Sequence, residues 1–258
     1  MTLQFRSAVN SAAKMLSDRD FPSNIPQAKP LSPGEALGCT APDNLAELSS
    51  STGESVMLFV ADGRFHLEAA MMANPTLRAL RYDPYSKTLT EEQYDHSQMR
   101  HLRLKSIDRA TSAKTYSIIL GTLGRQGYPA VLSTLRTLLQ KNNKRYSMLL
   151  LSEIFPSKLQ MFSKDVDPWV QVACPRFSVD WGHAFTKPLL NSFELHVSLG
   201  EATLPSVEPT EIQQPYPMDY YKVNSGPWSN YHDSNRTRKL KYDNVVENLP
   251  LGEQKTHE

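Results

Sequence analysis

The sequence has few cysteines and no excess of charge. It contains two cysteines in 258 residues, too few and too far apart for a disulfide framework, a zinc ribbon or a ferredoxin. Its 28 Lys and Arg nearly balance its 27 Asp and Glu, so no global field attracts nucleic acid or anionic lipid. No apolar run reaches the about 20 residues of a bilayer span. We therefore expect a cytoplasmic chain without a membrane or nucleic-acid partner.

Long apolar runs without alternation recur along the chain, which is typical of strands buried on both faces. The sequence predicts strands at 56–60, 77–82, 116–120, 146–151 and 169–173. It predicts helices at 3–16, 67–73, 91–114, from 129 and at 158–162. A polar loop and a helix follow most strands, so the fold class is α/β, with parallel sheets flanked by helices. Residues 3–16 are read as a core helix, with a mitochondrial presequence as the weaker alternative.

Two further local predictions concern the segment before Cys39 and the end of the chain. Ser32, with Pro33 behind it and Glu35 three residues on, is a capping pattern for a short helix that ends at Gly38. Beyond about residue 200 prolines recur and the apolar pattern stops. This predicts an irregular, partly disordered tail over 201–258. Within the tail, the aromatic stretch 214–221 is suited to docking on the body.

The stretch Trp169–Arg176 is the most informative one for function. It reads as a buried strand that stops at Cys174 and Pro175. A thiol at the carboxyl end of a parallel strand lies in the crevice where α/β proteins bind ligands. The other cysteine, Cys39, follows Gly38. Two isolated cysteines are more often small buried hydrophobes, so the question is whether the fold brings them together.

Glycines and arginines follow several predicted strands and could bind a small anion. The loops concerned are 62–66, 121–127, 152–155 and 174–176. From these loops we predict Arg64, Gly124, Arg125 and Gln126 as cofactor-binding residues, because glycine amides and guanidinium groups suit carboxylate or phosphate. The alternative is plain turn chemistry for the glycines and structural ion pairs for Arg64 and Arg176. The sequence indicates no catalytic residue.

Several long motifs together carry a resemblance. They are Lys29–Thr40, Asp62–Glu68, Ala73–Pro75, Arg81–Lys87, Ile119–Gly127, Leu149–Lys158, Trp169–Arg176, Asp180–Gly182 and Lys187–Leu189. With them the chain resembles the subunit 1 family of eukaryotic 2-(3-amino-3-carboxypropyl)histidine synthase, also called the diphthamide biosynthesis protein 1 family, over nearly all of residues 2–233.

The resemblance implies a radical transferase. Three similar α/β domains would surround a 4Fe-4S cluster, each domain supplying one cysteine. S-adenosyl-L-methionine would bind the open iron and be cleaved to a 3-amino-3-carboxypropyl radical, which adds to a histidine of elongation factor 2. This is the first step of diphthamide biosynthesis. Subunit 1 would act as a heterodimer with subunit 2, and a small iron protein would donate electrons.

Residue by residue, the resemblance assigns Cys39 and Cys174 as the cluster ligands of the family's second and third domains. It predicts domains at 1–112 and 113–200, followed by the tail 201–258. No third cysteine is present. The family's first domain would precede this sequence, and Thr2–Phe5 would be the stub of the second domain's opening strand. An apolar face of the second domain should then be uncovered.

Three functional readings follow. The first is a subunit with the transferase activity. The second is a non-catalytic truncated form that binds subunit 2 or elongation factor 2 without turnover. The third, weaker reading is a cluster-free α/β enzyme that binds a nucleotide.

Overall fold

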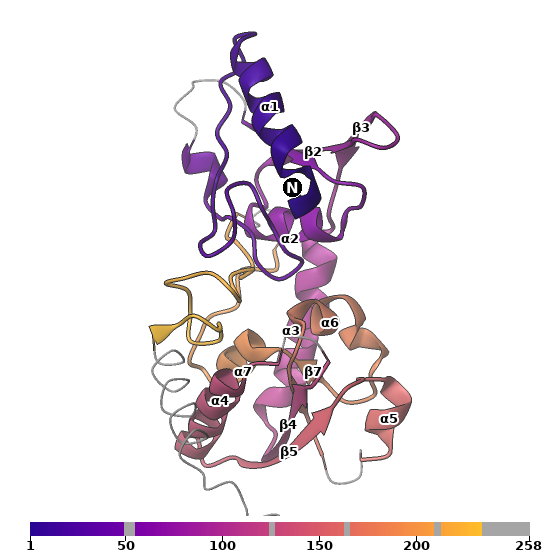
Figure 1. Ribbon diagram of the computed structural model, residues 1–258. Coiled ribbons are helices and arrows are strands. Elements are labelled where there is room, and N and C mark those ends of the chain that lie inside the picture. The colour runs from indigo at the N-terminus through magenta and orange to yellow at the C-terminus, as the bar shows by residue number, and fades with distance from the viewer. Residues whose placement is uncertain (49–54, 124–126, 163–165, 209–212, 234–258) are drawn as a thin grey trace, which may run out of the picture.

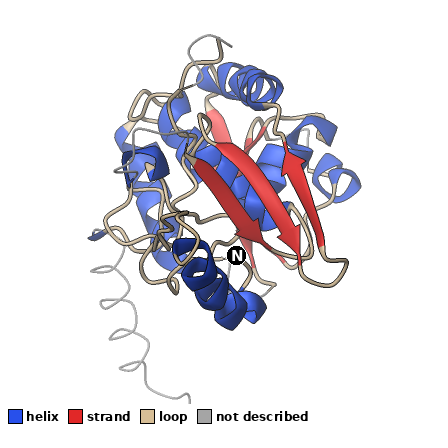
Figure 2. Cartoon of the chain, turned by 90° about the horizontal axis from the view of Figure 1, so that it is seen from above, coloured by secondary structure: helices blue, strands red, loops and turns tan. Residues whose placement is uncertain are grey.

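The computed structural model describes residues 1–48, 55–123, 127–162, 166–208 and 213–233. Two separate sheets organise these residues (Figure 1). The first sheet has the strand order β1-β2-β3 and the second has the order β5-β4-β6-β7. Seen from above, helices lie beside the strands (Figure 2). The predicted α/β class, with parallel sheets flanked by helices, is confirmed.

The first sheet combines one parallel and one antiparallel pairing. Strand β1 (Val56–Val60) pairs in parallel with β2 (Arg78–Asp83), and helix α2 (Phe65–Ala73) connects them. Strand β3 (Thr88–Glu92) returns antiparallel to β2. The predicted helix at 91–114 is therefore too long at its start: α3 spans His96–Thr111. Salt bridges from Arg78 to Glu91 and from Arg81 to Glu92 hold β3 in the sheet instead.

The second sheet is parallel throughout. Its strands are β4 (Thr115–Gly121), β5 (Arg145–Leu151), β6 (Trp169–Val172) and β7 (Leu189–Leu190). Its helices are α4 (Pro129–Lys141), α5 (Pro156–Gln160), α6 (Pro175–Trp181), the 3-10 turn η3 (Gly182–Ala184) and α7 (Ser192–Ser198). The strands and helices predicted here are present, with ends shifted by a few residues.

Helix α3 leads from the first sheet to the second and packs against α6 and α7 (Figure 1). The Asp95 side chain caps it by accepting the amide of Gln98. On its buried face the Arg103 guanidinium donates to both carboxylate oxygens of Glu194 in α7, at 2.6 and 2.7 Å. Both side chains are almost fully buried, so this pair joins α3 to the second sheet's helices.

Two local predictions near the N-terminus are wrong. The helix expected after Ser32 is absent, because Gly34 adopts φ +75° and the chain turns there, although Glu35 still accepts the amide of Ser32. Residues 3–5 form a 3-10 turn, η1 (Leu3–Phe5), ahead of helix α1 (Arg6–Ser17), rather than a strand stub. Among the described residues, one backbone hydrogen bond joins this segment to β1: the Thr2 amide donates to the Val60 carbonyl at 3.3 Å.

Strands β1 and β5 are not buried on both faces, contrary to the sequence prediction. Val56 and Leu58 of β1 are 40% and 42% exposed, while their neighbours Met57 and Phe59 pack into the core. On β5, Leu150 is 68% exposed. Apolar composition alone did not reveal that these strands lie at sheet edges with one uncovered face.

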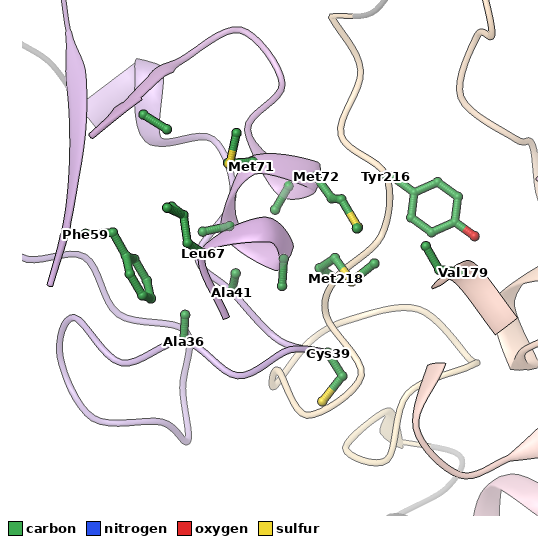
Figure 3. Close-up of a cluster of buried hydrophobic side chains, with 14 of the residues drawn as sticks. Ala36, Cys39, Ala41, Phe59, Leu67, Met71, Met72, Val179, Tyr216 and Met218 are labelled. Carbon is green, nitrogen blue, oxygen red and sulfur yellow. The ribbon is translucent and has the colours of Figure 1, made fainter. Parts of the chain in front are cut away.

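The segment 213–233 docks on the body, as its aromatic residues predicted, and its backbone runs through turns and bends, as predicted for an irregular tail. Tyr216, Met218 and Tyr220 are buried in the cluster around α2. Figure 3 shows the first two of these side chains. The tail residues 209–212 and 234–258 lie outside the described part. Within the described part, no helix is long and apolar enough to cross a membrane.

Candidate metal centre at the junction of the two sheets

Cys39 lies at the tip of a tight turn. The Leu37 amide donates to the Thr40 carbonyl at 2.7 Å, and the Thr40 amide donates back at 3.3 Å. A Cβ placed on Gly38 would lie 2.1 Å from Cε1 of Phe65, so only glycine lets the turn pack on this ring. The Thr40 hydroxyl contacts Cys39 Sγ at 3.9 Å. The turn thereby holds a thiol that is only 7% exposed.

Cys174 is the residue directly before α6 and lies two positions after the end of β6 at Val172. The side-chain Nε2 of Gln171 donates to the Cys174 carbonyl at 2.9 Å and to the Ser178 hydroxyl at 3.0 Å. These bonds tie the loop to both the strand and the helix. Burial raises the pKa of the Cys174 thiol, and the amides of Arg176 and Phe177 act in the opposite direction.

The two cysteine segments converge, although Cys39 lies in a turn that packs in the α2 cluster and Cys174 follows β6 of the second sheet. Burial raises the pKa of Cys39 to about 12, and the charge of Cys174 is the next largest cause. The segments that carry the two thiols lie side by side: the Tyr220 amide donates to the Cys39 carbonyl at 3.3 Å, and Tyr220 and Tyr221 line one cavity with Ala173 and Pro175, the neighbours of Cys174. Figure 3 places Cys39 at the side of a core cluster that also contains Met218 and, from α6, Val179. The fold therefore brings together two thiols that are remote in sequence.

Arg176 connects the two cysteine segments. Its guanidinium binds Asp180 in its own helix, and it reaches across to the Phe65 carbonyl at 2.9 Å and the Glu68 carboxylate at 2.5 Å. Burial raises the pKa of both Cys39 and Cys174, and the charge of Arg176 offsets part of that rise. From the sequence, Arg176 could either bind an anionic ligand or form a structural ion pair. The structure shows an ion pair whose field favours thiolate.

Arg64 is likewise engaged within the protein. Its guanidinium binds Glu68 at 2.8 Å, Glu92 at 3.3 Å and the Gln93 carbonyl at 2.9 Å. Its side chain is half exposed, so its role toward a cofactor stays a prediction. The other three predicted cofactor-binding residues, Gly124, Arg125 and Gln126, lie outside the described residues.

Sequence reasoning missed Tyr221, which borders both cysteines. Burial raises the pKa of Tyr221 to about 12, followed by the charge of Cys39 and, more weakly, of Cys174. Its amide donates to the Thr40 hydroxyl at 2.9 Å. The aromatic character of 214–221 was the available signal, but it indicated docking and not the place of docking.

A small polar cavity lies beside Cys174. It has a volume of about 20 Å³ and is lined among others by Gln171, Pro175, Tyr220 and Tyr221. Gln171 Oε1 and the Tyr220 hydroxyl are buried and have no hydrogen-bond partner among the described groups. A space of this size with two such groups suits one bound water molecule.

The donor set fits part of an iron–sulfur ligand shell. Thiolates are the usual ligands of such clusters, and here two thiols meet beside a buried guanidinium. Within the described ranges, no group of three or more His, Cys, Asp or Glu side chains could hold a metal ion. Cys39 and Cys174 could therefore supply two ligands of a cluster, and its remaining ligands would come from elsewhere.

Comparison with known proteins shows extensive similarity. The family model described as a diphthamide synthesis protein matches residues 1–207. Relatives named 2-(3-amino-3-carboxypropyl)histidine synthase subunit 1 are 47% identical over 234 residues in Dictyostelium discoideum and 48% identical over 236 residues in Homo sapiens. The matches cover 89% and 91% of this chain but 47% and 50% of those relatives. The chain thus spans about half the length of the curated relatives it matches.

The fold is similar to that of a solved archaeal protein. Dph2 from Pyrococcus horikoshii, whose crystal structure contains a 4Fe-4S cluster, superposes with a TM-score of 0.61 at 24% identity. The superposition covers 83% of this chain and 60% of the archaeal chain. At this identity the similarity concerns the fold.

Proposed function

Because the chain belongs to the diphthamide synthesis protein family, we propose that it contributes two cysteine ligands to a 4Fe-4S cluster used in the first step of diphthamide biosynthesis. The observation that supports the proposal is that residues 220 and 221 contact the Cys39 turn and also line a cavity with the two residues that flank Cys174. Each thiol is held by its own backbone network, which is the preorganisation that a metal site requires.

The proposed reaction is transfer of the 3-amino-3-carboxypropyl group of S-adenosyl-L-methionine to a histidine of elongation factor 2. The cluster, when bound, would supply one electron to the sulfonium, which splits into methylthioadenosine and the carbon radical that is transferred. The chain's own residues position the thiolates and surround them. Arg176 adds positive charge beside both sulfurs and so favours their ligand form.

Further ligands and partners are part of the proposal. The third thiolate would come from the segment that the longer relatives have in addition. A partner subunit, subunit 2, would form the heterodimer, a small iron protein would donate electrons, and the complex would work in the cytoplasm. The name "subunit 1" of the relatives supports a partner subunit.

Anaerobic reconstitution with iron and sulfide tests the ligand assignment. We expect the wild-type chain to bind iron and absorb in the visible region, and Cys39→Ser and Cys174→Ser each to lose most of this absorbance. Ser198→Ala, a buried change in α7, is the matched control and should keep it. If both cysteine variants bound as much iron as the wild type, the ligand assignment would be wrong.

A second candidate function is binding without turnover. The exposed apolar residues of β1 and β5, Val56, Leu58, Met148 and Leu150, favour it, because uncovered apolar sheet faces are typical of interaction surfaces. Capture of subunit 2 or elongation factor 2 by both cysteine variants, together with no group transfer by the wild type, would support this candidate over the first.

A further inference from the structure

The C-terminal segment 213–233 contacts both halves of the molecule. In Figure 1 it lies beside the first sheet's helices and above α7. Its residues Tyr216, Met218 and Tyr220 are buried in the core cluster that also contains Cys39. The family model ends at residue 207, before this segment begins. We call residues 213–233 the clasp.

On one side, the clasp binds the Cys39 turn through its backbone. The Tyr220 amide donates to the Cys39 carbonyl at 3.3 Å, and the Tyr221 amide donates to the Thr40 hydroxyl at 2.9 Å. The Ala41 amide donates to the Met218 carbonyl at 2.9 Å. Three consecutive residues of the turn are therefore tied to the clasp.

On the other side, the clasp binds the helix that follows β7. The Tyr216 hydroxyl donates to Glu194 at 2.8 Å, and the Ser192 hydroxyl donates to the Trp228 carbonyl at 2.9 Å. The Trp228 ring packs edge-on against Phe193, with 4.9 Å between ring centres. Glu194, Ser192 and Phe193 all belong to α7. This helix follows β7, the strand that pairs with β6 just before Cys174.

The clasp is closed upon itself between these two contact areas. The Trp228 indole N–H donates to the Asp219 carboxylate at 2.7 Å. The backbone N–H of Asn230 donates to the Tyr220 carbonyl at 2.8 Å. A compact loop transmits displacement from one end to the other better than an open strand. It also lines the cavity beside Cys174 with Tyr220, Tyr221 and Trp228.

We propose that the clasp sets the position of Cys39 relative to Cys174, with Tyr221 as a positioning residue that closes the site beside both thiols. Ligands of one cluster must be held to about 0.5 Å, and the two cysteines lie on separate loops, the turn 37–40 and the loop between β6 and α6. The clasp connects the Cys39 turn to the sheet that carries Cys174. The effect of the clasp on iron binding rests on the proposed function. Its effect on the position of Cys39 is independent of that function.

The test compares Trp228→Ala and Tyr221→Ala with Leu135→Ala. Leu135 is fully buried in α4, in a different core cluster, so its truncation destabilises the protein without touching the clasp. Trp228→Phe keeps a ring against Phe193 while losing the bond to Asp219, so its effects should be intermediate between those of Trp228→Ala and the wild type. Folding of every variant is checked by circular dichroism and thermal melting.

Two measurements are made on each variant. The first is the rate of Cys39 alkylation by iodoacetamide in the metal-free chain, followed by mass spectrometry of the peptides. We expect about a tenfold increase in both clasp variants and no increase in Leu135→Ala, since local opening governs the access to a buried thiol. The second is iron bound per chain after reconstitution, which should fall by at least about half in the clasp variants alone.

The outcomes separate this proposal from the proposed function. Wild-type rates and wild-type iron content in Trp228→Ala and Tyr221→Ala would overturn the role of the clasp. Equal effects in Leu135→Ala at equal loss of melting temperature would overturn it too, because the clasp would then be ordinary core. If the wild type bound no iron but the clasp variants still exposed Cys39, the positioning role would stand and the cluster assignment would fail.

Discussion

The guanidinium carbon of Arg176 lies 4.5 Å from the centre of the Phe65 ring. That ring lies in turn against Gly38, the residue before Cys39, while Arg176 is the second residue after Cys174. A continuous path of direct contacts therefore runs from one cysteine to the other. Because the contacts along this path are direct, we can predict how single substitutions affect the site around Cys39 and Cys174.

Replacing Arg176 with Met should destabilise the protein by about 3 kcal/mol, because Glu68 and Asp180 lose a buried counter-charge. Urea unfolding monitored by circular dichroism measures this. Arg176→Lys retains the charge but not the fork that serves Asp180, Glu68 and the Phe65 carbonyl, so it should recover only part of the loss. Full stability of Arg176→Met would show that the ion pairs are dispensable.

Gly38→Ala should cost about 1–3 kcal/mol, since its Cβ would lie 2.1 Å from the Phe65 ring. On a Phe65→Ala background the same change should cost almost nothing, because the obstructing ring is gone. A double-mutant cycle of unfolding free energies measures the coupling directly. Simple additivity of the two changes would mean that some contact other than Phe65 demands glycine at position 38.

Glu194→Gln should destabilise the protein by about 3–5 kcal/mol, because it leaves the buried Arg103 without a counter-charge. The double variant Arg103→Met with Glu194→Leu should be more stable than Glu194→Gln, since no unpaired charge stays in the core. The exposed pair of Lys141 and Glu201 provides the control, and Lys141→Gln should change stability by less than about 1 kcal/mol. A loss no larger than the control's would argue against a buried charge pair.

His96 should make the protein less stable in mild acid. Burial, and then the charge of Arg100, lowers the pKa of His96 from 6.5 to about 4, while Asp95 acts weakly in the opposite direction. The folded state therefore holds the neutral ring, and its contribution to stability is complete above pH 6.5 and is lost as the pH falls toward 4. The contribution is on the order of 1–2 kcal/mol once solvent screening of this part-exposed ring is allowed for.

His96→Gln removes this titration. Its free energy of unfolding, measured from pH 7 to pH 4, should fall less steeply than that of the wild type. Parallel curves for the two proteins would assign the acid sensitivity to other groups.

Most of the elements could be predicted because their signals are local. The apolar runs at β1, β4, β5 and β6 and the helical pattern of α4 specify their type within a few residues. The misses have physical reasons. The capping pattern at Ser32 was overridden by the turn at Gly34, and the polar strand β3 is held by cross-strand ion pairs with β2 that no local pattern announces.

The candidate site was predictable in its members and less so in its surroundings. Cys39 and Cys174 were identified by the family motifs around them and by the end of the β6 run. Arg64 was chosen as a ligand residue, yet it is engaged with Glu68 and Glu92. Tyr221 was not chosen, because its place beside the thiols depends on how a distant segment docks.

The order of the predicted strands and helices, the α/β class and the two cysteines at loop positions follow from the amino-acid sequence by itself, because each depends on neighbouring residues. The meeting of the two thiols, the Arg176–Phe65–Gly38 contacts and the docking of residues 213–233 were decided only by the tertiary structure. They join segments far apart in the chain, and such contacts exist only once both sheets and α3 have packed.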